Sequence, residues 1–199
     1  RVVEHGRQSA LRLGVDTIDL YQIHWPNPVF PLRPQLDGMH TLLDEGVISH
    51  VGVSNFGATR WAQADAHLGR PVLSNQVHFS LLYRKPETTN VPFAQANDRI
   101  VIAYSPLEMG VLGGKYSAEH PPPGAARTRS PLCLPENLAR AEPVLDALRR
   151  IARDHDATPA QVALAWLIRK PNVVAIPGAS SVEQLRHNAA AADLELTDD

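Results

Sequence analysis

The chain has a single cysteine, Cys133, among its 199 residues, so no disulfide can form within it. Nothing in its composition requires an oxidising compartment, and we expect a cytoplasmic location. Long hydrophobic runs are also absent, because no apolar stretch approaches the ~18 residues that a membrane-spanning helix needs. These two scarcities argue against a disulfide-stabilised scaffold and predict that a membrane is not a partner.

A strong charge of one sign is missing as well. The 19 Lys and Arg residues nearly balance the 21 Asp and Glu residues, and the formal net charge is -2. The sequence therefore gives no reason to expect a nucleic acid as partner. The nine histidines are scattered without metal-ligand spacing, so we expect no metal site. The oligomeric state is left open.

What the sequence does contain is an alternation of short apolar runs and helix-like periods. Strands are expected at 18–24, 48–54, 72–77, 100–104 and 173–176. Helices are expected between and after them, at 35–45, 58–68, 87–97, 162–168 and beyond Gly178. This alternation is typical of parallel β/α architecture and predicts an α/β fold.

The alternation breaks at 105–135, a stretch rich in Gly and Pro that we expect to form a long loop. Loops of this length inside a compact domain are usually functional or disordered. Residues 119–129, which hold three consecutive prolines, have the weakest tendency to order. Helical periodicity returns at 144–152, and Thr158 before Pro159 predicts a capped helix start.

The first expected strand ends in residues that could contribute to a reaction site, rather than in a plain turn. Its sequence, Asp19-Leu-Tyr-Gln-Ile-His-Trp-Pro26, is apolar until it reaches His24 and Trp25. In a parallel barrel, reacting groups lie at the carboxyl ends of the strands. An isolated histidine at such a position is more often held by the backbone, and that alternative stays open for His24 alone.

This segment resembles the one that carries the active-site histidine of the aldo-keto reductases, and similar motifs follow at 52–56, 103–107 and 176–188. The resemblance covers essentially all 199 residues. It implies a partial (β/α)8 TIM barrel, the last five strand-helix units, in a single domain over 1–199. The family's catalytic Asp, Tyr and Lys would then belong to units that precede residue 1. We therefore expect a fragment that is inactive alone and that aggregates or depends on another chain, because its open sheet has unpaired edges.

The resemblance also implies an activity, the NADP-dependent reduction of an aldehyde or ketone to an alcohol. His24 would be the catalytic residue of this chain, holding the carbonyl oxygen that gains charge as hydride arrives. Trp25 would line the substrate pocket or pack at its rim. The partner is then a small carbonyl compound, whose identity the variable loops of a barrel do not disclose.

Two strand ends carry side chains that match a carboxamide. Gly52-Val-Ser-Asn-Phe56 places Ser54 and Asn55 side by side, and Gln76 ends the next strand. A hydroxyl and side-chain amides complement the carbonyl and amide of nicotinamide, and the family equivalents of these three residues bind it. The alternative is an ordinary helix cap after the strand.

Ala103-Tyr-Ser-Pro-Leu107 is the next landmark. Tyr104 ends a strand, where its ring can stack on the nicotinamide. Ser105, Leu107 and Gly110 follow in a loop whose glycines let backbone amides approach a pyrophosphate. A buried tyrosine before a Pro-Gly loop is the alternative, and the resemblance favours the stacking role.

The final landmark is the start of the last helix. Ser180 and Glu183 have the spacing of a capping box, and a helix N-terminus after the last barrel strand is a natural phosphate site. The resemblance assigns the adenosine phosphate and adenine of the cofactor to Gly178, Ser180, Gln184 and Asn188. The alternative is a helix cap with exposed polar residues.

This landmark departs from the best-known family pattern, in which a lysine stands at the position of Gly178 and an arginine at that of Gln184. Charge for a 2'-phosphate would then come from Arg186, Arg127 or Arg129. We therefore expect NADP as cofactor, with NAD possible.

Two other roles are compatible with the same motifs. One is a cofactor-binding regulatory subunit that resembles the β subunits of potassium channels. The other is a degenerate, inactive remnant of a reductase.

Overall fold

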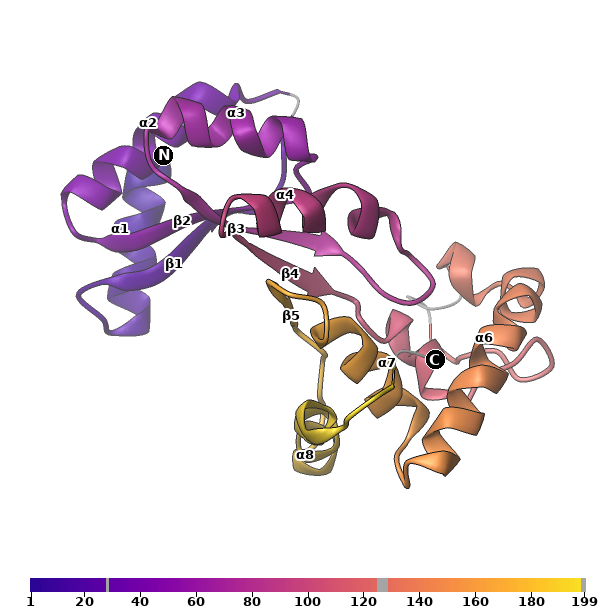
Figure 1. The fold of residues 1–199 in the computed structure, drawn as a ribbon. Helices are drawn as coiled ribbons and strands as arrows, with labels where there is room; N and C mark the ends of the chain where they lie inside the picture. Colours follow the sequence, from indigo (N-terminus) through magenta and orange to yellow (C-terminus); the bar gives the residue numbers. More distant parts are fainter. Residues whose placement is uncertain (28, 125–128, 198–199) are drawn as a thin grey trace. The chain divides into compact units, whose positions relative to one another are not determined.

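The computed structural model describes residues 1–27, 29–124 and 129–197. Its five strands form one sheet in chain order, namely β1 (Ile18–Ile23), β2 (Ile48–Ser54), β3 (Val72–His78), β4 (Ile100–Tyr104) and β5 (Val173–Ala175). The pairs β1–β2 and β2–β3 are parallel, and a helix lies between consecutive strands along the chain (Figure 1). The α/β architecture expected from the sequence is therefore observed.

The described helices alternate with these strands. They are α1 (Val2–Leu13), α2 (Leu32–Asp44), α3 (Ala58–Leu68), α4 (Asn90–Ala96), α6 (Pro135–Asp154), α7 (Pro159–Ile168) and α8 (Val182–Ala189). Short 3-10 turns are η1 (Lys85–Thr88), η2 (Glu108–Gly113), η3 (Pro131–Cys133) and η4 (Ala190–Asp193). Within the described ranges, every helix is too short or too polar to cross a lipid bilayer.

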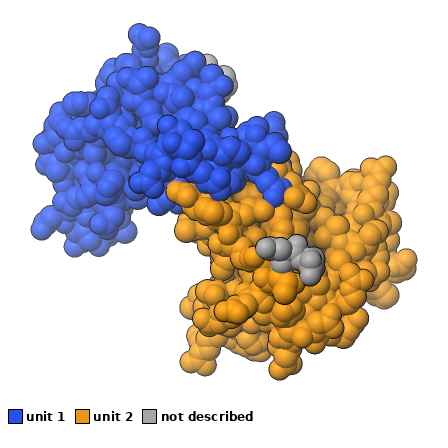
Figure 2. All heavy atoms as spheres, in the orientation of Figure 1, with its two compact units in different colours: residues 1–77, 85–102 blue, residues 78–84, 103–199 orange. Residues whose placement is uncertain are grey.

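Contacts divide the chain into two compact units (Figure 2). Unit 1 consists of residues 1–77 and 85–102, and unit 2 of residues 78–84 and 103–199. Strand β4 begins in unit 1 and ends in unit 2, where the amide of Ile176 donates to the carbonyl of Ala103 at 3.1 Å. The expected single domain stays a prediction.

The core of unit 1 lies between its strands and helices α2 and α3. Each helix buries one apolar stripe at the spacing of three to four residues that an amphipathic helix requires. The stripes consist of Leu36, Met39 and Leu42 on α2, and of Trp61, Ala64 and Leu68 on α3. Helix α3 ends at Gly69, whose φ of 66° is the left-handed conformation that glycine adopts without strain.

Helix α3 also fixes the start of β3. The indole of Trp61, which is fully buried, donates from Nε1 to the carbonyl of Val72 at 2.8 Å. The amide of Val72 in turn donates to Oδ1 of Asp65 at 2.6 Å. Both backbone groups of Val72 are therefore satisfied by side chains one helical turn apart, which sets where this strand begins.

The core of unit 2 gathers around α6 and α7. Leu138, Leu145 and Leu148 of α6 pack with Val162 of α7 and with Leu112 of η2. Helix α7 begins as predicted, since Thr158 and Gln161 form a capping box around Pro159. Cys133 is a buried free thiol in this cluster.

The long loop expected at 105–135 contains two short 3-10 turns, η2 and η3, and its last residue already starts α6. Val111 and Leu112 are fully buried, so hydrophobic contacts within unit 2 stabilise η2 in a stretch whose Gly and Pro content predicts a loop. Of residues 119–129, four (125–128) lie outside the described residues.

Replacing Trp61 by Phe should destabilise the fold, because it leaves the buried carbonyl of Val72 without its donor. We expect the free energy of unfolding to fall by ~1–3 kcal/mol. The measurement is urea denaturation of a soluble protein that contains residues 1–199, with the slope of the transition unchanged. Trp25→Phe is the matched control: its side chain is 56% exposed, and the change should stay within ~0.5 kcal/mol. Equal losses in both variants would show that the Trp61–Val72 bond does not hold β3.

Candidate active site

Strand register in unit 1 brings three of the expected site residues into one row. Ser54 of β2 pairs with Gln76 of β3, and the β1–β2 register, which ends at Ile23 and Val53, places His24 next to Ser54 when continued by one residue. Because side chains alternate across a strand, this row shares its face with the row two residues earlier. The carboxyl ends of three neighbouring strands therefore present polar groups together.

The earlier row confirms which residues share that face. It consists of Gln22, Gly52 and Ser74, which pair in register. A Cβ at Gly52 would lie 2.5 Å from Oγ of Ser74 and 2.8 Å from Cγ of Gln22. Those two side chains thus crowd over Gly52 from either side, and only glycine leaves them the space.

Ser54, Asn55 and Gln76 form one hydrogen-bonded group. Oγ of Ser54 donates to the carbonyl of Gln76 at 2.9 Å and accepts from Nδ2 of Asn55 at 2.9 Å. The amide of Asn55 donates to the same carbonyl at 2.8 Å. The side-chain amide of Gln76 is half-buried, and no hydrogen bond to it is found among the described residues. It can therefore offer both a donor and an acceptor to a ligand.

Asn75, the neighbour of Gln76, faces the opposite way and is structural. Its Oδ1 accepts from the amide of Phe56 at 3.3 Å, and its Nδ2 donates to the carbonyl of Phe56 at 2.7 Å. Nδ2 of Asn90 donates to that same carbonyl at 2.8 Å. These buried amides hold the turn after β2 that carries Ser54 and Asn55.

His24 and Trp25 follow β1, which ends one residue earlier than expected, at Ile23. His24 is exposed, and no hydrogen bond from a described residue to its ring is found. Among the described residues, no hydrogen bond therefore supports the alternative in which the backbone holds the His24 ring. Trp25 is 56% exposed, as a residue at the rim of a pocket would be.

In unit 2, the other expected cofactor residues lie on a strained loop after β4. Ser105, Glu108 and Met109 have φ of 51°, 49° and 54°, and Gly110 has φ of 95°. Non-glycine residues in such conformations cost on the order of 1–3 kcal/mol each, and they cluster at functional sites. Asn55 of unit 1, with φ of 61°, shares this conformation.

Two backbone amides of this loop donate hydrogen bonds within the loop itself. The amide of Gly110 donates to the carbonyl of Leu107 at 2.9 Å, and that of Glu108 donates to the carbonyl of Ser105 at 3.0 Å. The glycine is therefore needed for its positive φ, while its amide closes the turn. A Cβ on Gly110 would meet only the ring of Tyr116, at an ordinary 3.5 Å.

Three polar residues beside Tyr104 were missed in the sequence. His78 is the last residue of β3, Ser80 follows it, and Glu108 is buried with 5% exposure in η2. Nε2 of His78 lies 2.7 Å from Oε1 of Glu108, and Oγ of Ser80 donates to the same oxygen. The sequence position of His78 could have indicated this, because His78 stands two residues after Gln76. Residues two apart in a strand lie on the same face of the sheet.

Burial raises the pKa of Tyr104 above its ordinary value, and the nearby Tyr83 and Glu108 raise this pKa further. The phenol therefore stays neutral throughout the physiological range. A neutral ring suits stacking rather than nucleophilic chemistry.

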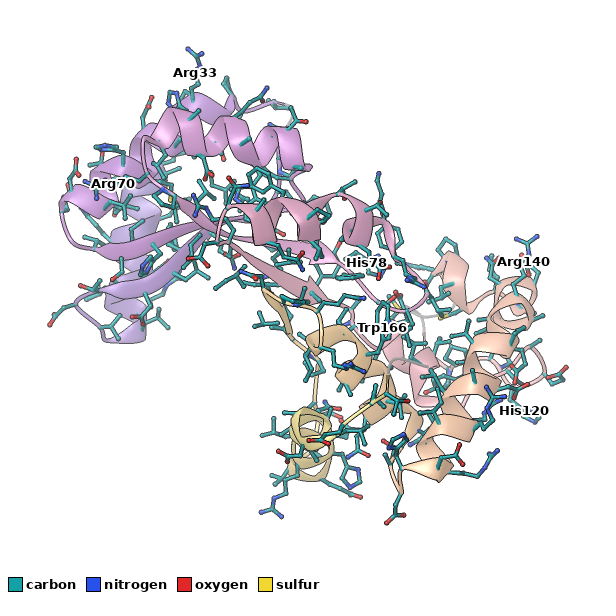
Figure 3. The ribbon with its side chains drawn as sticks, in the orientation of Figure 1. Arg33, Arg70, His78, His120, Arg140 and Trp166 are labelled. Atoms are coloured by element: carbon teal, nitrogen blue, oxygen red, sulfur yellow. The ribbon has the colours of Figure 1, made fainter. Side chains whose placement is uncertain are left out.

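The neighbours Tyr83 and Arg84 contact different rings. Tyr83 stacks on His78, and the guanidinium of Arg84 lies over the ring of Trp166 (His78 and Trp166 are labelled in Figure 3).

The start of α8 differs from the expected capping box. Ser181, not Ser180, is the N-cap, and its Oγ accepts from the amide of Gln184 at 3.1 Å. Oε1 of Gln184 accepts from the amide and the hydroxyl of Ser180, at 2.7 and 2.9 Å. Glu183 therefore has no part in the box: the helix starts one residue later, and Gln184 occupies the third helical position.

The remaining predicted residues of this landmark lie close by. Nδ2 of Asn188 reaches the carbonyl of Gly178 at 3.4 Å, so the turn before α8 is tied to its last part. Arg186 is exposed on α8 and Arg129 is exposed in unit 2, whereas Arg127 lies outside the described residues. Across residues 1–27, 29–124 and 129–197, no group of three His, Cys, Asp or Glu side chains is arranged to hold a metal ion.

Comparison with known proteins identifies sequence relatives of this chain. The chain is 60% identical over 191 residues to an uncharacterized oxidoreductase of Mycobacterium tuberculosis, covering 96% of this chain and 59% of that protein. It is 30% identical over 194 residues to the NADH-specific methylglyoxal reductase of Escherichia coli, covering 96% and 59%. The chain thus spans about three-fifths of the length of these relatives.

A solved structure is also similar to this chain. A thermostable aldo-keto reductase in complex with the inhibitor epalrestat superposes with a TM-score of 0.80 at 34% identity, covering 99% of this chain and 62% of that one. The expected partial (β/α)8 barrel is confirmed by this similarity together with the five-stranded sheet. The model of the aldo/keto reductase family matches residues 1–199. The chain therefore belongs to the aldo/keto reductase family.

Proposed function

We propose that this chain belongs to an oxidoreductase that reduces aldehydes or ketones with a nicotinamide cofactor, NADPH in preference to NADH. The observation that carries the proposal is the pairing of Ser54 with Gln76 at the ends of two parallel strands, with His24 directly after the end of the neighbouring β1. Carbonyl reduction needs a carboxamide holder and a group beside the carbonyl oxygen, and these residues offer both kinds of side chain.

The residues of unit 1 fit the carboxamide of the cofactor. The side-chain amide of Gln76 can donate and accept, and the side chains of Ser54 and Asn55 are already oriented by their mutual hydrogen bond. Orientation before binding lowers the entropic cost of holding the ring. When bound, the reduced nicotinamide supplies a hydride to the carbonyl carbon of the substrate.

His24 has the chemistry of the residue that holds the carbonyl oxygen. A neutral imidazole N–H can donate to this oxygen, and the bond strengthens as negative charge develops there. The exposed ring has no competing hydrogen bond from the described residues, so it can donate to a substrate. Trp25, equally exposed, supplies an apolar surface for the rest of a small carbonyl compound.

Unit 2, taken by itself, also carries groups that suit parts of a dinucleotide cofactor. Tyr104 offers a neutral ring for the nicotinamide, and the strained loop with Ser105, Leu107 and Gly110 offers a turn for the pyrophosphate. Gly178, Ser180, Gln184 and Asn188 surround the start of α8, where a helix N-terminus attracts a phosphate.

The proposed cofactor preference is modest for a physical reason. The start of α8 carries no cation at Gly178 or Gln184, and both donors of Ser180 are already used by Gln184. A helix N-terminus contributes ~0.3–1 kcal/mol to a nearby anion, and up to ~2 kcal/mol when partly buried. At ~1.4 kcal/mol per factor of ten, this gives a preference for NADPH of about 2- to 5-fold, and of about 30-fold at most.

We also propose the cytoplasm as the compartment. The support is the single cysteine, Cys133, which is a buried free thiol rather than half of a disulfide. Reduced thiols and nicotinamide cofactors are both typical of that compartment.

The direct test of the function is a spectrophotometric assay on a soluble protein that contains residues 1–199. NADPH oxidation at 340 nm should be seen with small aromatic and aliphatic aldehydes. Tight NADPH binding without turnover of any carbonyl compound would instead favour a cofactor-binding regulatory subunit. No binding of either dinucleotide would point to a degenerate remnant.

His24→Gln should lower kcat by ~10²–10⁴-fold, because the bond from His24 gains strength only as charge develops on the oxygen. NADPH affinity, measured by fluorescence titration, should change little. His50→Gln is the matched control, since His50 is another exposed histidine of this sheet and only contacts the carbonyl of Asp19 at 3.0 Å. A large loss of NADPH affinity with unchanged kcat would place His24 in a structural role.

Gln184→Arg should sharpen the preference for NADPH. The change releases both donors of Ser180 and adds a guanidinium that can bind phosphate with two hydrogen bonds. Fluorescence titrations of NADPH and NADH with both proteins give the ratio directly, and Leu185→Met, next along α8, is the control. Equal affinities in the wild type, or no gain in the variant, would remove this helix start from the phosphate site.

A further inference from the structure

Three aromatic rings of unit 2 form a column that ends at Tyr104. The rings of His78 and Tyr83 are stacked, with centroids 4.4 Å apart and planes inclined by 6°. The rings of His78 and Tyr104 are also stacked, with centroids 5.4 Å apart and planes inclined by 13°. His78 (labelled in Figure 3) therefore stacks with two tyrosines.

The imidazole of His78 is itself anchored. Its Nε2 lies 2.7 Å from Oε1 of Glu108, a buried carboxylate. The hydroxyl of Ser80 donates to the same oxygen, and that hydroxyl accepts from the amide of Tyr83 at 3.0 Å. The anchor thus connects the turn that carries Tyr83 with the ring that stacks on it.

The same carboxylate holds the strained loop. Glu108 has φ of 49°, between Ser105 at 51° and Met109 at 54°, which are conformations that these residue types seldom adopt. Such a conformation persists only where surrounding contacts impose it. The bonds from His78 and Ser80 to Glu108 are contacts that hold this residue in place.

We propose that His78 and Glu108 are positioning residues that fix the ring plane of Tyr104 and the loop 105–110, and thereby set the affinity for the nicotinamide end of the cofactor. The proposal rests on the proposed function, in which Tyr104 stacks on the nicotinamide. Stacking on His78 restricts the orientations of the Tyr104 ring before a ligand binds. Without this contact the ring has more orientations to lose on binding, which lowers the affinity for the ligand.

Three variants separate the ring contact from the carboxylate anchor. His78→Leu removes both the stack and the bond to Glu108. His78→Phe keeps an aromatic ring in the column but loses the bond. Glu108→Gln keeps an acceptor for Ser80 but loses the charge that faces His78. Glu119→Gln is the matched control, because Glu119 is an exposed carboxylate of the same unit.

The measurement is the dissociation constant for two probes, NADPH and adenosine 2',5'-bisphosphate, which lacks the nicotinamide. Aromatic pairs contribute ~0.5–1.5 kcal/mol, which corresponds to a loss of ~2- to 10-fold in NADPH affinity for His78→Leu. We expect smaller losses for His78→Phe and Glu108→Gln. Affinity for adenosine 2',5'-bisphosphate should stay within about twofold of the wild type, as should every constant of the Glu119→Gln control.

The outcomes distinguish the positioning role from a structural one. If both probes lose affinity equally, or if His78→Leu lowers only the melting temperature, the network merely stabilises unit 2 and the proposal is wrong. If His78→Phe binds NADPH as weakly as His78→Leu does, the ring contact contributes nothing to affinity and the stacking part of the proposal is wrong. A wild-type protein that binds neither probe would refute the proposed function itself, before any variant is compared.

Discussion

The parallel pairing of β1, β2 and β3, in which the β2–β3 register shifts once between Val51 and Gly52, is the constraint on which the rest of unit 1 depends. Because side chains alternate, each strand sends one set of residues to its helices and the other set to the opposite face. Val53 and Asn75 on the helix side are fully buried, whereas Ser54 and Gln76 end the other face. A shift of one residue in any strand would exchange these roles and scatter the polar row.

Hydrogen bonds of buried side chains convert that register into a defined site. Asn75 and Asn90 satisfy the backbone of Phe56 and hold the turn after β2. In unit 2, Glu108 performs a comparable task for the loop after β4, through charge-assisted bonds rather than amides. Both turns contain residues with positive φ, so each strained segment has a buried polar group that offsets its cost.

Membership of the aldo/keto reductase family explains why the polar groups stand at strand ends, and the departures from its pattern show what is particular to this chain. Gln184 bonds to Ser180 at the start of α8, where a cation would bind phosphate directly. His78, which is half-buried, and the buried Glu108 form a polar pair beside Tyr104.

The sequence by itself determined the local elements, since β2, α3 and β4 lie at the predicted bounds. Apolar periodicity and a terminal glycine are local signals that need no knowledge of distant residues. Only the tertiary structure decided the turns η2 and η3, the one-residue shift of the α8 cap and the pairing of His78 with Glu108, which are 30 residues apart. Burial and hydrogen-bond partners depend on which segments pack together, and a single sequence does not encode that in any local pattern.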